Sequence, residues 1–161
     1  MGGGGGGREH AERVRVERLE QVARQKLAEA GLRGPNVFLS FDGDDLDLAN
    51  GLRGQLANED TDLNFQDWSV KEPYNSDKAE YIKARIRERI RRSSVVLVLL
   101  TEHSAQSHWV EWEINEAVRQ GKRVIGMHTH ANPPSHLPAP FVEHGLRVIP
   151  WSHENIMQAL E

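Results

Sequence analysis

The chain of 161 residues contains no cysteine. This absence excludes disulfides, thiolate nucleophiles and cysteine-based zinc sites. Long apolar runs are also missing: none approaches the roughly 18 residues that a membrane-spanning helix needs, and no apolar segment near the N-terminus has the pattern of a secretion signal. We therefore expect a cytoplasmic protein whose chemistry relies on carboxylates, imidazoles, hydroxyls or amides.

Glycine is scarce outside one short tract. Six of the 14 glycines form the run Gly2–Gly7, and we expect residues 1–7 to be a flexible tail. In the chain as a whole, 38% of the residues are hydrophobic and 27% are charged, a balance typical of folded globular proteins. The length fits a single domain.

Positive charge is in deficit over most of the chain. Residues 36–161 hold 13 Lys and Arg against 19 Asp and Glu, whereas residues 8–33 hold seven against five. A net charge of −6 on the main body argues against a nucleic-acid-binding face. One dense basic stretch, Lys83–Arg92, has the pattern of a helix whose other face is apolar. We interpret it as a solvated helix face in preference to a phosphate-binding patch.

Residues 8–33 are predicted to form an N-terminal amphipathic helix. The stretch from Arg8 to Ala30 contains neither Gly nor Pro, and Gly31 supplies a stop signal. Its apolar residues recur at steps of three and four, namely Val16, Leu19, Ala23, Leu27 and Ala30. This stripe can pack on the chain's own domain or on a copy of itself, and both options stay open.

From Asn36 onward, short apolar runs alternate with helical patterns. Predicted strands cover 37–41, 63–68, 95–100, 123–127 and 146–149, and a Pro-rich loop covers 132–140. Predicted helices contain Leu48, Leu52 and Leu56, then Ala79, Ile82, Ile86 and Ile90, then residues 108–120, with Ser76 or Asp77 and later Ser107 as caps. The alternation predicts an α/β three-layer sandwich with a mostly parallel five-stranded sheet, preceded by the N-terminal helix. The unbroken apolar run 95–100 is expected to be its central strand.

Polar and aromatic residues follow the predicted strands at their carboxyl ends, where ligands collect in such folds. They are Ser40, Phe41, Asp42 and Asp45 after the first strand, Trp68 and Ser69 after the second, residues 101–104 after the central one, and His128 and His130 after the next. The two histidines lack a third ligand, so we predict no metal site and favour a hydrogen bond from a strand-end histidine to its loop.

Glu113 stands out on the helix after the central strand. On a helical wheel it borders the arc of Val110, Ile114 and Ala117 that faces the sheet, on the side of Trp109. Partial desolvation raises the pKa of such a carboxyl, while the helix N-terminus favours its anion, and functional carboxylates often combine these opposed effects. A boundary residue paired with an arginine is the alternative.

Four segments, taken in order, resemble a TIR domain. They are Asn36–Phe41 with its Asp-rich turn, Leu99–Thr101, the Ser-x-Trp-Val-x-x-Glu run Ser107–Glu113, and Gly121–His128. More narrowly, residues 36–150 are similar to the TIR-like family of the Thoeris antiphage system. The resemblance implies a flavodoxin-like TIR-type fold and assigns residues 36–161 to a TIR-like domain.

The resemblance also implies an activity, the cleavage of NAD at the nicotinamide glycosidic bond, with NAD as the substrate, no further cofactor and no metal. Glu113 matches the catalytic glutamate of the Trp-Cys-x-x-Glu motif, and Val110 replaces the cysteine. The Asp-x-x-Pro-Gly loop of many relatives is absent after the second strand. Some family members cyclise the ADP-ribose product into a signalling nucleotide.

Seven further residues are candidates for binding this substrate. Ring stacking is expected from Phe41, Trp68 and Trp109, contacts to ribose hydroxyls from Ser40, Asp45 and Ser69, and Asp42 joins the acidic mouth of the site. The three aromatic residues have a core lid as their structural alternative. Ser40, Asp45 and Ser69 have turn-forming or helix-capping roles as theirs.

The expected partners follow from the same resemblance. They are further copies of the chain through TIR–TIR contacts, a phage-derived activator and a downstream nucleotide-sensing effector in antiviral defence, with no nucleic acid and no membrane. Two other functions stay open. One is a non-catalytic TIR adaptor that acts by self-association. The other is a Mg²⁺-dependent haloacid-dehalogenase-like phosphatase built on Asp42, Asp44 and Thr101, although the late acidic pair for Mg²⁺ is missing.

Overall fold

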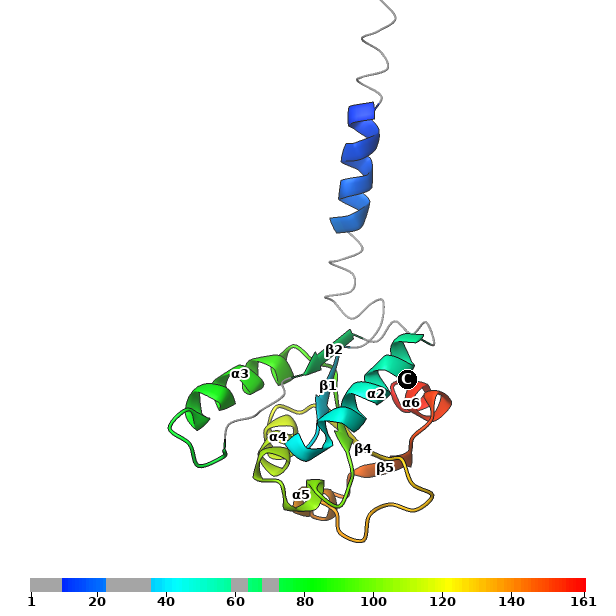
Figure 1. The fold of residues 1–161 in the computed structure, drawn as a ribbon. Coiled ribbons are helices and arrows are strands. Elements are labelled where there is room, and N and C mark those ends of the chain that lie inside the picture. Colours follow the sequence, from blue (N-terminus) through cyan, green and yellow to red (C-terminus); the bar gives the residue numbers. More distant parts are fainter. Residues whose placement is uncertain (1–9, 23–35, 59–63, 68–72) are drawn as a thin grey trace, which may run out of the picture. The chain divides into compact units, whose positions relative to one another are not determined.

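The computed structural model describes residues 10–22, 36–58, 64–67 and 73–161 (Figure 1). Two units separate along the chain, Met1–Gly34 and Pro35–Glu161. In the first, residues 10–22 are helical and exposed, including Val16 and Leu19 of the expected stripe. The rest of that stripe and the glycine tail lie outside the described residues. No helix among the described residues is long and apolar enough to cross a membrane.

The domain is built on a parallel sheet. Its strands are β1 (Asn36–Ser40), β2 (Asn64–Asp67), β3 (Val95–Leu99), β4 (Arg123–His128) and β5 (Arg147–Pro150), in the order β2-β1-β3-β4-β5. All neighbouring pairs are parallel. The α/β class and the parallel sheet are thus confirmed. The central strand β3 is fully buried on both faces, as its unbroken apolar run predicted.

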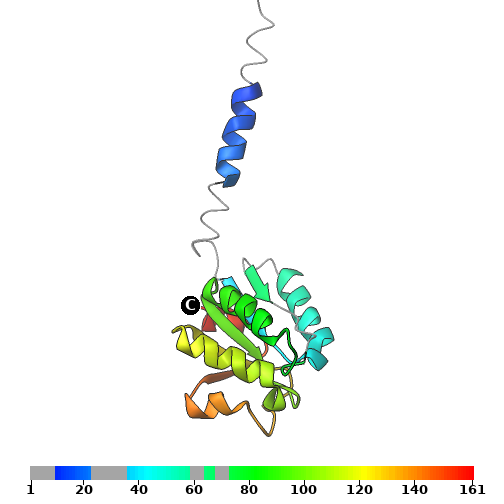
Figure 2. The same ribbon diagram turned by 90° about the vertical axis from the view of Figure 1, so that its left-hand side faces the viewer.

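Helices cover both faces of the sheet (Figure 2). They are α2 (Leu46–Asn58), α3 (Ala79–Arg91), α4 (His108–Arg119), α5 (Ala139–Glu143) and α6 (His153–Ala159), with the short 3-10 turns η1 (Gly43–Asp45) and η2 (Ser104–Gln106). One core cluster joins α2 and α6 to alternate strand residues, and the other joins α3, α4 and α5 to the residues between them. In β1, Val37 and Leu39 belong to the first cluster and Phe38 to the second. Because side chains alternate along a strand, Ser40 points to the same side as Phe38, toward α3 and α4.

The core face of α2 runs through Ala49, Leu52 and Leu56. Leu52 and Leu56 are buried as expected, but Leu48 is 38% exposed and Ala49 takes its place in the core. Positions 49, 52 and 56 follow the three-then-four spacing of one helix face, whereas a series of steps of four drifts around the helix. The predicted helix through Leu48, Leu52 and Leu56 is thus confirmed, and Leu48 lies on its exposed side.

The prediction that Ser76 or Asp77 caps α3 is wrong, although the predicted core stripe of this helix is confirmed. Lys78 occupies the cap position without a side-chain hydrogen bond, and the backbone carbonyl of Ser76 accepts from the N–H of Ala79 at 3.1 Å. A backbone turn therefore leads into this helix. Four residues of the stripe are buried, as expected, namely Ala79, Ile82, Ile86 and Ile90.

The boundaries of α4 agree with the prediction. The hydroxyl of Ser107 accepts from the N–H of Val110 at 3.3 Å, and Gly121, with a φ of 73°, follows the end of the helix. In contrast, α5 begins inside the segment 132–140 predicted as loop, and α6 was not predicted. Pro140 lies in the first turn of α5, where a missing N–H costs nothing.

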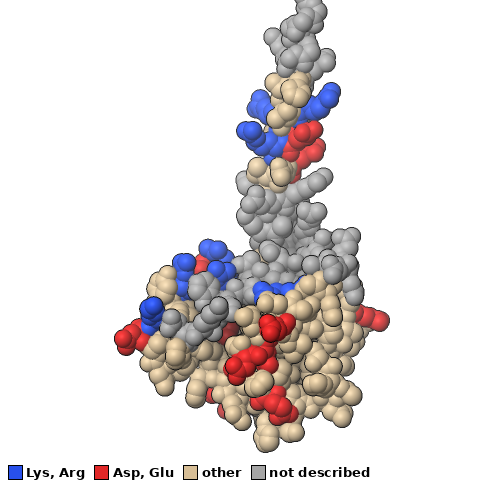
Figure 3. Space-filling view, in the orientation of Figure 1, with Lys and Arg blue, Asp and Glu red and all other residues tan. Residues whose placement is uncertain are grey.

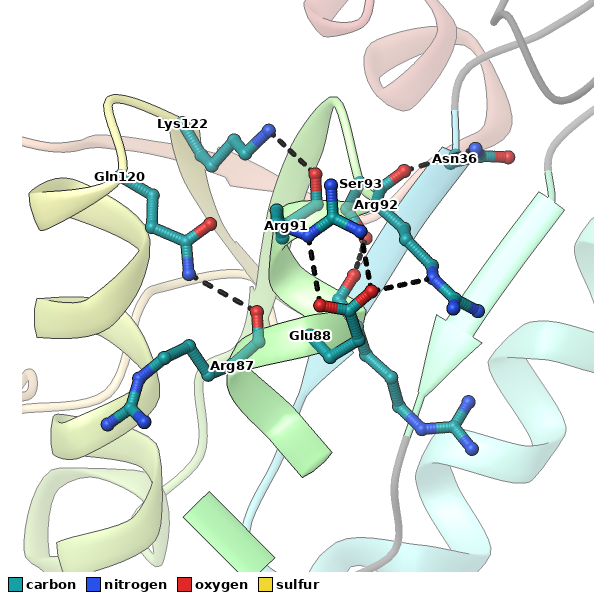
Figure 4. A network of polar contacts seen from close by, with 9 residues as sticks. Asn36, Arg87, Glu88, Arg91, Arg92, Ser93, Gln120 and Lys122 are labelled. Carbon is teal, nitrogen blue, oxygen red and sulfur yellow. Dashed lines mark hydrogen bonds and ion pairs between the residues drawn. The ribbon is translucent and has the colours of Figure 1, made fainter. Parts of the chain in front are cut away.

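A polar network closes the carboxyl end of α3 at the amino edge of the sheet (Figure 4). Its last carbonyls accept from side chains of the neighbouring elements: Arg87 O from Gln120, Arg91 O from Lys122 and Arg92 O from Asn36. Glu88 pairs with Arg91 and Arg92, so two charges of the basic stretch are balanced on their own helix. This network stabilises the edge opposite the predicted site.

Candidate active site

Glu113 lies deeper than a boundary position. It occupies the second turn of α4 and is only 2% exposed, between Val110 and Ile114, which are fully buried. Burial raises the pKa of the Glu113 carboxyl well above its ordinary value, since water no longer solvates the anion. The prediction of partial desolvation therefore understated the burial, and the packing around this carboxyl favours its neutral form.

The Ser40 hydroxyl is the polar neighbour of this carboxyl. Ser40 ends β1, is fully buried and faces α4, and its hydroxyl opposes the upward pKa shift of Glu113 because a nearby donor favours the anion. Nevertheless, within the described part of the chain Ser40 Oγ completes no well-aligned hydrogen bond. A buried polar atom left in this way costs free energy, on the order of 1–3 kcal/mol, and such atoms are rare in native structures.

A second polar cluster, formed by Asp45, Thr101 and His103, joins the segments that follow β1 and β3. The buried carboxylate of Asp45 accepts from the Thr101 hydroxyl through Oδ2, and its Oδ1 lies 2.8 Å from His103 Nδ1. Thr101 Oγ1 in turn accepts from the backbone N–H of His103 at 3.1 Å and of Ser104 at 3.3 Å. Both oxygens of Asp45 therefore have protein partners, and the predicted contact of Asp45 with a ribose stays a prediction.

Two other predicted residues have structural duties. Phe41 is buried in the core cluster that it shares with Ala49 and Leu52, so its ring packs inside the domain. Asp42 accepts from the N–H of Asp44 at 3.0 Å through its carboxylate and thereby caps η1. The packing of Phe41 matches the core-lid alternative that the sequence left open, and the binding role expected of Asp42 stays a prediction.

Trp109 lies among aromatic and cationic side chains. Its ring meets Tyr74 edge-on with centroids 5.0 Å apart and Trp112 at 6.3 Å, and Lys83 Nζ lies 4.6 Å from the centroid of Tyr74. The ring of His108 stacks on Tyr74 at 5.5 Å. Trp109 is partly exposed one turn before Glu113, so part of an aromatic surface adjoins the buried acid.

Not every predicted site residue can be placed. Trp68 and Ser69 lie outside the described residues. Of the others, the structure brings Ser40 next to Glu113 and places Asp45 at the same edge of the sheet. The sequence reasoning did not single out His103 or Tyr74 as site residues. For His103 a signal was available, because residues 101–104 follow the central strand at its carboxyl end.

The histidine at the end of β4 holds the loop that follows the strand. His128 is buried, and its Nδ1 lies 2.7 Å from the backbone carbonyl of His130, as favoured from the sequence. In the ranges that the structure describes, no group of three or more His, Asp or Glu side chains is placed to hold a metal ion.

Acidic side chains gather on the face of the domain that Figure 3 shows. Near the end of β1, Asp44 and Asp47 are exposed and Asp42 is partly exposed. Negative charge at this edge of the sheet favours a cationic group in the ligand over an anionic one.

The strand order and the helices on both faces define a flavodoxin-like α/β domain. The chain belongs to a family of TIR-like domains: the family model described as the TIR-like domain of the Thoeris protein ThsB matches residues 38–134. The resemblance noted from the sequence is thereby confirmed. The match leaves the phosphatase alternative without a supporting observation.

Among the solved structures that match the chain, two are distant likenesses. A CMP N-glycosidase, BcmB, of Clostridium botulinum is 14% identical with a TM-score of 0.48, covering 78% of this chain and 97% of its own. The TIR domains of the activated Roq1 resistosome are 18% identical with a TM-score of 0.44, covering 62% of this chain and 60% of their own. Both TM-scores are below 0.5, so neither likeness assigns a function. No curated protein matches the chain.

Proposed function

We propose that this protein cleaves NAD at the nicotinamide N-glycosidic bond, with Glu113 as the catalytic carboxylate. The observation that carries the proposal is a buried glutamic acid on α4 beside the buried Ser40 hydroxyl, which completes no well-aligned hydrogen bond in the described part of the chain, at the carboxyl edge of a parallel sheet. Both groups occupy the part of the fold where ligands bind. Membership in the Thoeris TIR-like family supports the same assignment.

Cleavage of the bond between nicotinamide and ribose requires mainly electrostatic stabilisation of the transition state from the protein. Nicotinamide in NAD is already cationic and leaves as a neutral molecule, while positive charge spreads over the ribose. A carboxylate facing the ribose stabilises that charge in the transition state more than in the ground state. The raised pKa of Glu113 fits this role because a cationic substrate at the site draws the acid toward its anion.

Other residues of this edge have supporting roles in the proposal. Ser40 Oγ, which is without a hydrogen-bond partner among the described residues, donates to a ribose hydroxyl or to the Glu113 carboxylate once substrate is bound. The partly exposed face of Trp109 stacks on a substrate ring. Trp68 and Ser69 retain the binding roles expected from the sequence. The acidic turn after β1 favours the cationic nicotinamide.

The product is ADP-ribose or a cyclic derivative of it that acts as a signalling nucleotide in bacterial antiviral defence. We propose that the protein acts as a homo-oligomer in the cytoplasm, responds to a phage-derived activator and signals to a nucleotide-sensing effector. NAD is the substrate, and no cofactor takes part.

Incubation of the purified full-length protein with NAD tests this function. Nicotinamide and adenine nucleotide products are separated by chromatography for the wild type, for Glu113→Gln and for Glu111→Gln. Glu111 is an exposed carboxylate on the same helix and provides the matched control. We expect the wild type and Glu111→Gln to release nicotinamide and Glu113→Gln to be inactive.

Two results would overturn the proposal. Release by Glu113→Gln at the wild-type rate would move the chemistry away from this residue. No release by any variant, in dilute buffer, under crowding and with a phage lysate present, would favour the adaptor that acts by self-association.

A further inference from the structure

The pair of Asp45 and His103 has no part in the function proposed above, yet it has the form of a proton-transfer site. A carboxylate only accepts hydrogen bonds, so the 2.8 Å contact with Asp45 Oδ1 assigns the ring proton to His103 Nδ1. Asp45 is buried and is fixed on its other oxygen by Thr101, whereas the His103 side chain is 55% exposed. The second ring nitrogen, Nε2, is therefore left to accept a proton from outside the domain.

The pair lies at the same edge of the sheet as Ser40. Ser40 is the last residue of β1 and pairs with Val98 of β3. Asp45 follows β1 by five residues and Thr101 follows β3 by two, and their hydrogen bond joins the two segments beyond the sheet. Through its contact with Asp45, His103 thus lies at the sheet edge where β1 and β3 end, the edge that also holds Ser40, the neighbour of Glu113.

We propose that His103 Nε2 is the general base of the reaction and accepts the proton of the water molecule that attacks the ribose. The inference rests on the proposed cleavage of NAD and assigns to that site a second catalytic residue. The bond between ribose C1′ and the nicotinamide nitrogen breaks, and its electron pair leaves with neutral nicotinamide. The water oxygen bonds to C1′, and one water proton passes to His103 Nε2, from which it is released to solvent.

The charges around His103 set the pH at which it can act. The hydrogen bond to Asp45 and the charge of Asp45 raise the pKa of His103 above its ordinary value. Burial opposes this rise, and the charges of Asp44 and Asp42 add smaller contributions to it. His103 is a base only when neutral. Activity should therefore increase with pH along a limb whose midpoint lies above 6.5, the ordinary value for histidine.

The test is a pH profile of NAD hydrolysis by the full-length protein, for the wild type, His103→Ala, Asp45→Asn, Glu113→Gln and the control His144→Ala, an exposed histidine on α5's carboxyl side. We expect His103→Ala to lower kcat by about 100-fold, to regain activity with added imidazole, and to keep only the acidic limb that the ionisation of Glu113 sets. Asp45→Asn should move the limb to lower pH, because the charge that raises the pKa is gone. Thermal unfolding shows whether each variant is folded.

The outcomes separate the two proposals. If the wild type hydrolyses NAD and Glu113→Gln does not, but His103→Ala keeps the wild-type rate and limb, the role of His103 is overturned and the cleavage stands. The role of His103 is likewise overturned if His103→Ala loses rate and gains nothing from imidazole, since that marks a structural role. If the wild type releases nicotinamide but forms only a cyclic product, the role of His103 is overturned and the cleavage stands. If the wild type releases no nicotinamide, both proposals are overturned together.

Discussion

At the scale of the single residue, the buried carboxyl of Glu113 lowers the free energy of unfolding by an amount that depends on pH. Its folded-state pKa lies above the unfolded value of 4.5, so the folded protein binds more protons between these two values, and stability falls as pH rises through that range. We predict that Glu113→Gln is more stable than the wild type at pH 8, by about 1 kcal/mol or a rise in Tm of about 3 °C. The difference should shrink toward pH 4. Thermal unfolding across pH measures it, and a destabilised variant at pH 8 would contradict it.

Gly126 illustrates a residue whose lack of a side chain is required by packing. A Cβ at this position of β4 would lie 2.5 Å from a ring atom of Phe141 and 2.6 Å from a methyl group of Leu100. Gly126→Ala should therefore lower stability by about 1–3 kcal/mol through overpacking. Gly54→Ala is the matched control, because nothing lies within 4 Å of its Cβ and helix propensity should make α2 more stable by up to about 1 kcal/mol. Opposite signs in denaturant unfolding support this account, and equal signs refute it.

At the scale of the element, Glu116 ties α4 to α3. Its buried carboxylate accepts from Arg87 Nε at 3.1 Å, from Arg119 Nε at 2.9 Å and from Gln120 Nε2 at 3.0 Å. Hydrogen bonding from Arg119, above all, holds the pKa of Glu116 below its ordinary value, despite burial, which raises it. This contribution to stability is present above pH 4.5 and is lost as pH falls through the lowered pKa.

Replacing this carboxylate tests the link between the two helices. We predict that Glu116→Gln lowers the free energy of unfolding by about 1–3 kcal/mol at pH 7 and by less at low pH. Glu88→Gln serves as the control, since Glu88 is an exposed partner of Arg91 and Arg92, and exposed ion pairs contribute little. Equal effects of the two substitutions in urea unfolding would argue against a special role for Glu116.

The helices and strands also show which features of the fold could be predicted from sequence periodicity. Strand β3 and the stripe Ile82, Ile86 and Ile90 were predictable because their burial follows a simple period. Local hydrogen bonding decides the rest. Ser76 has the chemistry of a cap but takes part in a backbone turn, and α5 forms in a Pro-rich segment after Pro138. Such choices depend on tertiary contacts that no local pattern contains.

In the candidate site, too, the periodic features could be predicted from the sequence and the tertiary contacts could not. The sequence placed Glu113 beside the core by periodicity, and the resemblance gave it a role. The depth of its burial could not be predicted, because it depends on how α4 packs against Ser40 and the sheet. The hydrogen bond between Asp45 and His103 joins residues 58 positions apart, and only the fold brings them together.

At the scale of the whole molecule, the domain carries its own core. Both core clusters are made of residues between Val37 and Leu160. We predict that a chain beginning at Gly34 keeps the Tm of the full-length protein within about 2 °C, since no described residue before Val37 belongs to either core cluster. Light scattering on the same chain tests the role of the N-terminal helix. A smaller particle than the full-length protein would show that the helix drives assembly, and an unchanged size would show that it does not.

The central claim for the whole molecule is that the buried acid on α4 makes this TIR-like domain an NAD-cleaving enzyme. The most direct measurement is the initial rate of nicotinamide release from NAD by Glu113→Gln relative to the wild type, at one pH and with Glu111→Gln as the control. Our account predicts a loss of about 100-fold or more for Glu113→Gln and an unchanged rate for Glu111→Gln. Equal rates for the wild type and Glu113→Gln would contradict it.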